Sequence, residues 1–253
     1  MSEPTCLTAE KVCFGNLEIF FLENGNENKG CSPDDTLFML KNLYYIEGYQ
    51  RVKRHLWESS TSNILEIGIY RGGSAPFFHR FFDAQRLVCI DLATSPAIPL
   101  ENYRRRWAPG VIRTYYGVDQ ADRPKVTTIV EEEFSSPIDL VIDDASHCYE
   151  ETKTTLEIVF PYLRPGGIYV IEDWGWAHTP EAQLPDYYLA DKSALTNLVF
   201  DLIMIYGSES EVIQNIEFSP GMMWIKKGSA EVPIGTFRVE DYAPKRGRTL
   251  NLI

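Results

Sequence analysis

Short apolar runs alternate with amphipathic stretches over most of this chain, from Asn63 to Lys226. Four of the five central runs are almost continuously apolar, which is typical of parallel strands buried on both faces. These runs predict strands at Ile64–Ile67, Leu87–Ile90, Ile112–Tyr116, Ile138–Ile142 and Ile168–Ile171. Helical periods at Pro76–Phe82 and Tyr149–Tyr162 lie between them. The alternation predicts an α/β fold with a doubly wound, mostly parallel sheet.

The C-terminal part of the pattern adds two strands to this sheet. A helix is predicted over Ser193–Tyr206. The apolar runs Val212–Phe218 and Met222–Lys226 flank the turn sequence Ser219-Pro220-Gly221. A turn between two such runs predicts an antiparallel hairpin. We therefore expect seven strands in all, with the hairpin as the last two.

The first fifty residues and the tail lack this alternation. Phe14–Leu22 predicts a strand, and Ser32-Pro33-Asp34-Asp35 resembles a helix start, from which a loose helical period runs through Leu37 and Leu40 toward Tyr49. The tail after Gly228 has little periodicity. We expect one domain over residues 51–228, an extension at 1–50 that shapes a substrate pocket or an oligomer contact, and a tail at 229–253.

Composition excludes several classes of partner. The formal net charge of −12 argues against nucleic acid, which requires surplus Lys and Arg, and the run Arg104-Arg105-Arg106 fits a solvated helix face. The five cysteines form no C-x-x-C pair, so a disulfide framework and a thiolate zinc site are both poorly supported. Met1–Phe14 has no basic region followed by an apolar stretch, and no apolar run approaches the ~20 residues that cross a bilayer. We expect a cytoplasmic protein without a membrane partner.

A glycine-rich turn follows the first central strand. Gly68-Ile69-Tyr70-Arg71-Gly72-Gly73-Ser74 links Ile64–Ile67 to the next helix, where the backbone of an open α/β sheet can approach a ligand. A dinucleotide fingerprint would need glycine at the position of Tyr70, and a side chain there would crowd a pyrophosphate. The turn therefore disfavours NAD or FAD and is compatible with S-adenosylmethionine, which has no pyrophosphate.

An acid at the end of the second strand supports a nucleoside ligand. Asp91 lies 25 residues after Glu66 and ends the strand Leu87–Ile90. A carboxylate there is well placed to accept hydrogen bonds from both ribose hydroxyls. The alternatives are an ordinary tight turn for the glycines and a helix N-cap for Asp91.

These motifs resemble the class I methyltransferases. The stretch from Glu66-Ile67-Gly68 to Gly72-Gly73-Ser74 is similar to the family of macrolide sugar O-methyltransferases and cephalosporin-modifying methyltransferase-like proteins. The resemblance implies a Rossmann-like fold in which Glu66, Gly68 and Ser74 line the methionine end of the cofactor and Asp91 the ribose. Gly117-Val118-Asp119-Gln120 resembles the segment near the adenine. The full cofactor set that we expect is Glu66, Gly68, Tyr70, Arg71, Gly72, Ser74, Asp91, Asp119, Gln120 and Asp143.

Acidic clusters follow the fourth and fifth strands. Asp143-Asp144 and Glu172-Asp173 each come directly after a buried run, 28 residues apart from Asp144 to Glu172. Neighbouring parallel strands would bring Asp144, Glu172 and Asp173 to one rim, where three carboxylates repel one another unless a cation lies among them. Oxygen ligands suit Mg²⁺ by preference, with Mn²⁺ or Ca²⁺ as alternatives. The competing interpretation is helix capping. Carboxylates at these places bind Mg²⁺ in the family that the chain resembles, and Asp143 would face the cofactor.

His147 follows Asp144 by three residues. A hydroxyl on a divalent cation loses its proton more easily, and an imidazole nearby can accept it. The resemblance assigns this role to His147; the alternative is a histidine that only bonds solvent or backbone at a helix start. The aromatic residues Trp174, Trp176, Tyr187 and Tyr188 either form a lid over the substrate or pack against the core or another subunit.

The sequence thus predicts a metal-dependent O-methyltransferase with Asp144 and His147 as its catalytic residues. The expected substrate is a small hydroxylated molecule, a sugar hydroxyl or vicinal diol of natural-product type, and the expected assembly is a homo-oligomer. Two alternatives stay open. One is an enzyme of the same fold that performs another, hydroxylation-linked modification, and the other is a protein that binds S-adenosylmethionine without turnover.

Overall fold

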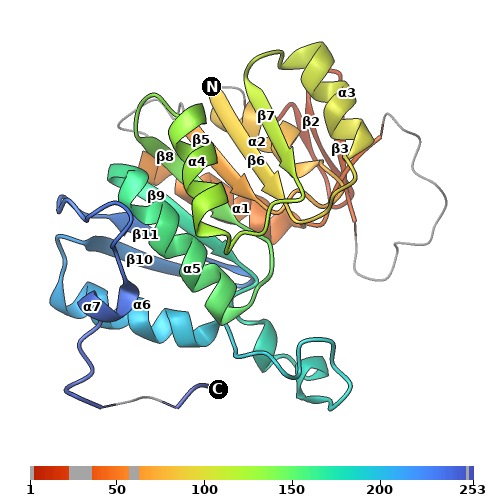
Figure 1. Ribbon diagram of the computed structural model, residues 1–253. Coiled ribbons are helices and arrows are strands. Elements are labelled where there is room, and N and C mark those ends of the chain that lie inside the picture. The colour runs from red at the N-terminus through yellow and green to blue at the C-terminus, as the bar shows by residue number, and fades with distance from the viewer. Residues whose placement is uncertain (1–2, 23–35, 57–62, 249–250) are drawn as a thin grey trace. The chain divides into compact units, whose positions relative to one another are not determined.

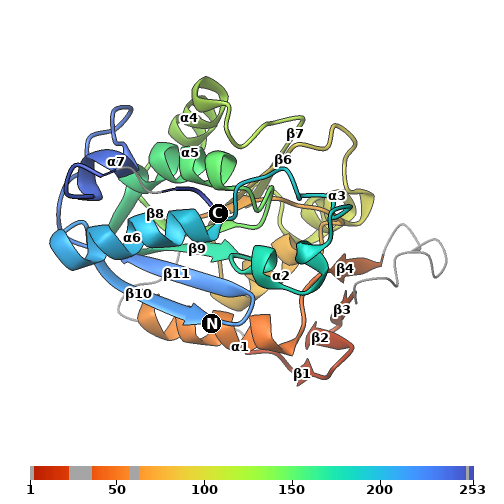
Figure 2. The same cartoon turned by 90° about the horizontal axis from the view of Figure 1, so that it is seen from below.

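The computed structural model describes residues 3–22, 36–56, 63–248 and 251–253. The strands of the main sheet follow the order β10-β11-β9-β8-β5-β6-β7 (Figure 1), and a separate sheet has the order β1-β2-β3-β4 (Figure 2). The predicted fold class, a mostly parallel seven-stranded α/β sheet that ends in an antiparallel hairpin, is confirmed. The chain divides into two compact units, Met1–Val118 and Asp119–Ile253. This division differs from the expected boundaries at residues 50 and 228, which stay a prediction.

The first unit, Met1–Val118, contains the small sheet and three parallel strands of the main sheet. β5 pairs with β6 and β6 with β7, all in parallel, so the carboxyl ends of β5 and β6 lie at one edge. Its elements are β1 (Cys6–Leu7), β2 (Lys11–Phe14), β3 (Leu17–Phe21), β4 (Leu37–Met39), α1 (Leu43–Leu56), β5 (Asn63–Ile67), α2 (Ser74–Phe82), β6 (Arg86–Asp91), α3 (Ile98–Trp107) and β7 (Ile112–Tyr116).

Aromatic side chains hold α1 against α2. The ring of Tyr49 on α1 contacts Phe77, Phe78 and Phe82 on α2, with the Tyr49 and Phe78 centroids 4.9 Å apart. All four side chains are buried. Burying large aromatic side chains stabilises a core strongly, so this cluster fixes the helix that follows the glycine-rich turn.

The helix expected from Ser32 toward Tyr49 is wrong in part. Ser32–Asp35 lies outside the described residues, but Leu37–Met39 forms strand β4, and α1 begins only at Leu43. β4 pairs in parallel with β3, Ile19 opposite Leu37. Leu37 and Met39 are buried on either side of a less buried Phe38, which is the period of a strand. Backbone pairing with β3 therefore overrides the loose helical pattern.

The second unit, Asp119–Ile253, contains the other four strands of the main sheet. β8 and β9 are parallel, while β11 is antiparallel to both β9 and β10. α4 and α5 lie side by side, and α5 and α6 lie on the same side of these strands (Figures 1 and 2). Its helices and strands are α4 (Arg123–Glu133), β8 (Ile138–Asp143), α5 (Tyr149–Val159), β9 (Leu163–Glu172), α6 (Thr196–Ser208), β10 (Ile213–Ser219), β11 (Met222–Lys227) and α7 (Val239–Tyr242), with 3-10 turns at Phe160–Tyr162, Trp176–His178 and Glu181–Gln183.

Of the helices in the described ranges, none has both the length and the apolar character needed to cross a membrane. The expectations of a cytoplasmic location and a homo-oligomer stay predictions.

Candidate functional site

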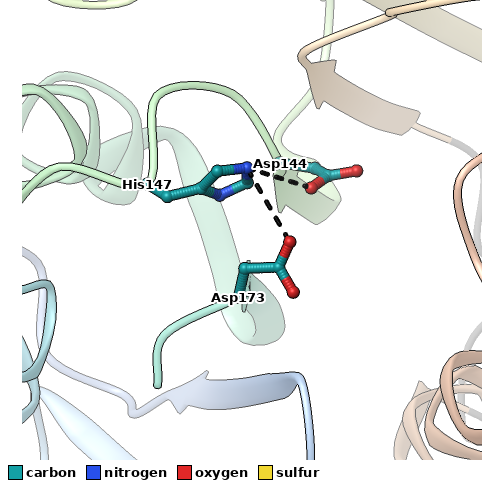
Figure 3. Close-up of side chains that lie close together, drawn as sticks. All are labelled: Asp144, His147 and Asp173. Atoms are coloured by element: carbon teal, nitrogen blue, oxygen red, sulfur yellow. Dashed lines mark ion pairs between the residues drawn. The ribbon is translucent and has the colours of Figure 1, made fainter. Parts of the chain in front are cut away.

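The register of β8 and β9 brings two acidic residues together in the second unit. Asp143, the last residue of β8, lies opposite Ile171 of β9, so the two parallel strands end within one residue of each other. Asp144 and Asp173 are the first residues beyond these ends. The predicted convergence of Asp144 and Asp173 follows directly from this pairing (Figure 3).

His147 completes this group. Its Nε2 lies 3.9 Å from Oδ1 of Asp144 and 3.8 Å from Oδ2 of Asp173. One ligand atom from each of the three side chains lies within 4.8 Å of the others. The three side chains are partly exposed, from 21% for His147 to 42% for Asp173, so solvent or a substrate can reach them. Two carboxylates and an imidazole at this separation are a donor set that a divalent cation can bridge.

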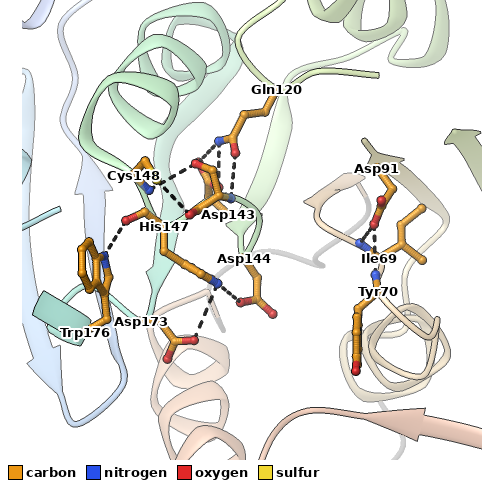
Figure 4. Close-up of polar contacts among 11 residues, drawn as sticks. Ile69, Tyr70, Asp91, Gln120, Asp143, Asp144, His147, Cys148, Asp173 and Trp176 are labelled. Carbon is orange, nitrogen blue, oxygen red and sulfur yellow. Dashed lines mark hydrogen bonds and ion pairs between the residues drawn. The ribbon is translucent and has the colours of Figure 1, made fainter. Parts of the chain in front are cut away.

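Both His147 and Asp173 have a left-handed backbone. Their φ angles are +57° and +51°, in a region that non-glycine residues enter only when the surrounding structure holds them there. The N–H of Asp173 donates to the carbonyl oxygen of Gly221 at 2.6 Å, which ties it to the β10–β11 turn. The carbonyl oxygen of His147 accepts a 2.6 Å hydrogen bond from Nε1 of Trp176 (Figure 4).

Asp143, the last residue of β8, is almost completely buried. Its carboxylate accepts hydrogen bonds from Tyr169 Oη at 2.8 Å and from Gln120 Nε2 at 3.3 Å. Burial raises the pKa of Asp143 to about 7, and these hydrogen bonds oppose the rise. Gln120 also accepts from the N–H of Ser146 at 2.9 Å, so one buried amide braces Asp143 and the loop that carries His147.

Glu172 is placed differently from the other two predicted carboxylate ligands. It is the last residue of β9, is 1% exposed, and does not belong to the group formed by Asp144, His147 and Asp173. Consecutive residues of a strand point to opposite faces, and Glu172 still follows the strand while Asp173 has left it. Its role as a metal ligand stays a prediction.

In the first unit, Asp91 holds the glycine-rich turn. Its Oδ2 accepts the N–H groups of Ile69 at 2.6 Å and Tyr70 at 3.0 Å, and its Oδ1 accepts that of Ala93 at 2.7 Å (Figure 4). Tyr70 has a left-handed backbone, φ +48°, that these bonds stabilise. A carboxylate offers about four lone-pair sites. Asp91 thus braces the turn and retains acceptor capacity for the predicted ribose contact.

Among the remaining residues of the turn, the glycines are closely packed and Tyr70 is exposed. Gly68 and Gly72 have φ angles of +94° and +84°, and a Cβ on Gly72 would lie 2.6 Å from Leu100 Cβ. The Arg71 guanidinium lies 5.7 Å from the centre of the Tyr70 ring, which is half exposed. Glu66 and Ser74 are buried at the two ends of the turn.

Asp119 and Gln120 belong to the second unit, in the segment after β7. Asp119 Oδ1 accepts from the N–H of Ala121 at 2.8 Å. The side chain of Gln120 is buried and contacts Asp143, Ser146 and Thr155. Their predicted contact with the adenine, and that of Asp143 with the cofactor, stay predictions.

The hydrogen bond from Trp176 to His147 was not foreseen. Trp176 appeared in the sequence only as one of several aromatic residues in a loop, where a lid and ordinary packing were both open. The structure stacks its ring on Tyr187, with centroids 5.6 Å apart and planes at 19°. Nothing in the spacing of Trp176 indicates that its indole reaches a backbone 29 residues earlier.

Comparison with known proteins finds that the chain is similar to methyltransferases. Residues 65–174 match a sequence profile described as a methyltransferase domain. Demethylmacrocin O-methyltransferase from Streptomyces fradiae is 33% identical over 144 residues, which cover 54% of this chain and 33% of the relative. Mycinamicin VI 2''-O-methyltransferase from Micromonospora griseorubida is 33% identical over 124 residues, 46% of this chain and 28% of the relative.

A solved structure is similar over a larger part of the chain. It is MycE methyltransferase from the mycinamycin biosynthetic pathway, in complex with Mg, SAH and mycinamycin VI. The TM-score is 0.55 at 25% sequence identity, and the match covers 76% of this chain and 52% of MycE. The matched regions therefore span about half of MycE and a third or less of the two curated relatives.

Proposed function

We propose that this chain, in which residues 65–174 match a methyltransferase domain, moves a methyl group from S-adenosylmethionine to a hydroxyl group of a small molecule, beside a divalent metal ion at Asp144 and Asp173. One observation carries the proposal. Donor atoms of Asp144, His147 and Asp173 lie within 4.8 Å of one another at the carboxyl ends of two parallel strands. Ligands of open α/β sheets bind at this edge.

The donor set fits a hard cation. Asp144 and Asp173 supply carboxylate oxygens, which Mg²⁺ and Mn²⁺ prefer, and the repulsion between two neighbouring carboxylates falls when a cation joins them. Glu172 remains in the proposal as a third carboxylate ligand, although its buried side chain would have to turn toward Asp173. A divalent ion there supplies Lewis acidity, which eases the loss of the acceptor's proton.

His147 is the proposed general base. Methyl transfer forms a bond between the acceptor oxygen and the methyl carbon and breaks the bond from that carbon to sulfur, so the hydroxyl proton must leave. Nε2 of His147 is placed to accept it, and Asp144 and Asp173, both within 4 Å, stabilise the positive charge that the ring then carries.

The methyl donor is proposed to bind the turn held by Asp91. The backbone of Gly68 can approach the donor closely because it has no side chain, whereas Gly72 leaves room for Leu100. Asp91 offers oxygen to ribose hydroxyls. The proposed binding site for the methyl donor also includes Glu66, Tyr70, Arg71, Ser74, Asp119, Gln120 and Asp143.

For the acceptor we propose a sugar hydroxyl of a natural product. The support is that the relatives are named for methylation of demethylmacrocin and of mycinamicin VI. A vicinal diol fits the proposal because it would offer two oxygen atoms, the ligand type that a hard cation prefers.

The test combines binding and turnover. S-Adenosylhomocysteine and Mn²⁺ are titrated calorimetrically into wild type, Asp144→Ala and Glu150→Ala, the last removing an exposed acid outside the group. We expect S-adenosylhomocysteine to bind all three alike, and Mn²⁺ to bind Asp144→Ala at least about tenfold more weakly. Transfer to demethylmacrocin or mycinamicin VI should require metal, and His147→Ala should lower kcat by about 10²-fold or more with donor binding intact.

Several results would contradict the proposal. Failure of wild type to bind S-adenosylhomocysteine excludes donor binding. Equal Mn²⁺ affinity in Asp144→Ala, or full turnover in excess chelator, excludes the metal site. An unchanged rate in His147→Ala removes this residue as the base.

A further inference from the structure

Two residues of the proposed metal group hold a backbone conformation that needs support. His147 and Asp173 both have positive φ, and both belong to short connections after strand ends. Single non-glycine residues in this region are strained and persist only where neighbouring contacts fix them. The contacts that fix His147 therefore determine where its imidazole points.

One residue links these two strained positions. The backbone N–H of Trp176 donates to the carbonyl oxygen of Asp173 at 3.1 Å. Its indole Nε1 donates to the carbonyl oxygen of His147 at 2.6 Å (Figure 4). Trp176 thus spans the gap between two of the three residues in the group.

The indole itself is held from the other side. Its ring stacks on Tyr187 at 19°, and Tyr187 in turn contacts Tyr188, with centroids 4.7 Å apart. Stacking restricts the ring to the orientation in which Nε1 faces His147. Phenylalanine at this position could stack in the same way but has no N–H to donate.

We propose that Trp176 is a positioning residue that fixes the backbone of His147, and through it the imidazole, beside Asp144 and Asp173. The inference deepens the proposed function, on which it rests for its chemical meaning. The structural part of the inference is that the indole N–H determines the position of the His147 ring. This part can be tested without measuring methyl transfer.

Trp174 provides a matched control two residues earlier. Its Nε1 also donates to a backbone carbonyl, that of Ser219, at 3.2 Å, and its ring contacts Phe218. Trp174→Phe therefore removes an indole hydrogen bond of the same kind that does not end at His147.

The first measurement needs neither metal nor acceptor. The ring signals of the four histidines are recorded by NMR at one pH in wild type, Trp176→Phe and Trp174→Phe, with His147 assigned by His147→Ala. We expect Trp176→Phe to shift or broaden the His147 signals, and Trp174→Phe to leave them in place. If the His147 signals are the same in Trp176→Phe and wild type, the inference is overturned.

The second measurement asks whether Trp176 acts through His147. The rate of methyl transfer with Mn²⁺ present is measured for wild type, Trp176→Phe, His147→Ala and the double variant. Residues that act through one another are not additive. We expect Trp176→Phe to lower kcat about fivefold to tenfold in the presence of His147 and not at all in its absence. An equal loss of rate in both backgrounds would assign Trp176 to general loop stability and overturn the inference.

Two further arms separate the remaining outcomes. If Trp176→Phe does not fold, as judged by circular dichroism, Tyr187→Leu loosens the ring while retaining the indole and should give a smaller change with the same dependence on His147. If wild type binds no divalent metal, the proposed function fails, and the His147 ring signals alone decide the inference.

Discussion

At the scale of single residues, backbone strain marks the two candidate turns. Tyr70 has φ +48° and is held by the carboxylate of Asp91, while His147 has φ +57° and is held by the indole of Trp176. In both cases a side chain distant in sequence stabilises a conformation that the local sequence disfavours. Such positions are concentrated at sites of ligand binding and catalysis.

The strand-end residues show what sequence can predict of a site. Asp144 and Asp173 were expected to converge because each follows a buried run, and the structure brings them together with His147. Asp143 and Glu172, one residue earlier, are almost completely buried. The sequence shows that two acids occur in a row after each apolar run, but it does not show at which residue the strand ends. The end of the strand determines which of the two acids is buried in the sheet and which lies in the loop beyond it.

A residue-scale prediction concerns His79 on α2. Its Nδ1 lies 2.8 Å from Oη of Tyr103 on α3, and burial lowers the pKa of His79. The unfolded chain therefore binds more protons at this residue below the ordinary imidazole pKa of about 6.5. The sign follows: His79 makes the free energy of unfolding fall as pH drops from about 6.5 toward its lower folded pKa.

Urea unfolding of wild type and His79→Gln at about pH 7.5 and about pH 5.5 brackets the ordinary imidazole pKa and tests this expectation. Wild type should lose more stability on acidification than His79→Gln, because every other titrating group is common to both. An equal loss in the two proteins would show that His79 keeps its proton affinity on folding.

At the scale of elements, the buried parallel strands were the best predicted part of the fold. β5, β6 and β8 differ from the predicted bounds by only a residue at one or both ends, because continuous apolar runs are typical of strands covered on both faces. β7, the partly exposed strand at the end of the sheet, has the predicted bounds. The sequence indicated α3 only as a helix face at Arg104–Arg106, and α4 was missed. Each begins with proline in its first turn, and Asp122 caps α4 by accepting from the N–H of Lys125, so a start signal was present. Neither helix has a clear apolar face in its sequence, so the start signal alone did not lead to a helix prediction.

An element-scale prediction concerns Lys227, the last residue of β11. It is 4% exposed, and its ammonium donates to the carbonyl oxygens of Phe160, Pro161 and Leu163 at 3.1, 2.9 and 2.7 Å. These carbonyls form the turn that leads from α5 into β9. Burial lowers the pKa of Lys227 to about 8, which leaves it mostly charged at pH 7.

Lys227→Met should destabilise the protein by about 2–4 kcal/mol, because three carbonyl oxygens lose their common donor. Lys226→Met is the control, since the neighbouring side chain points to the other face and should change stability by no more than about 0.5 kcal/mol. Urea unfolding monitored by tryptophan fluorescence measures both. Similar effects of the two substitutions would show that the carbonyls find other partners or water.

At the scale of the whole molecule, the resemblance drawn from the glycine turn and the acidic clusters is confirmed by the methyltransferase profile over residues 65–174 and by the relatives. Of the small sheet, the sequence predicts one strand, Phe14–Leu22, and the structure has β3 at Leu17–Phe21 within it. The pairing of β3 with β4 is not predicted, because it joins two segments with no common periodicity. The two candidate turns belong to different compact units, with Asp91 in Met1–Val118 and the metal group in Asp119–Ile253.

This division allows the two halves of the proposed chemistry to be tested separately by hydrogen exchange with mass spectrometry. A ligand that binds only the native state lowers exchange where it stabilises the local structure. S-Adenosylhomocysteine alone should protect residues 68–74 and 91–93, which include the three N–H groups that donate to Asp91. Mn²⁺ alone should protect residues 144–148 and 173–176, which contain the metal group and Trp176.

The two patterns discriminate between errors in the site assignment. Protection of residues 119–120 by S-adenosylhomocysteine would support the proposed roles of Asp119 and Gln120. If these residues are not protected, they do not belong to the binding site of the methyl donor. Asp144→Ala should abolish the Mn²⁺ pattern while the S-adenosylhomocysteine pattern persists, because Asp144 belongs to the metal group and not to the glycine turn. Loss of both patterns in Asp144→Ala would mean that donor binding depends on the acidic residues after β8. The assignment of donor and metal to separate sets of residues would then be wrong.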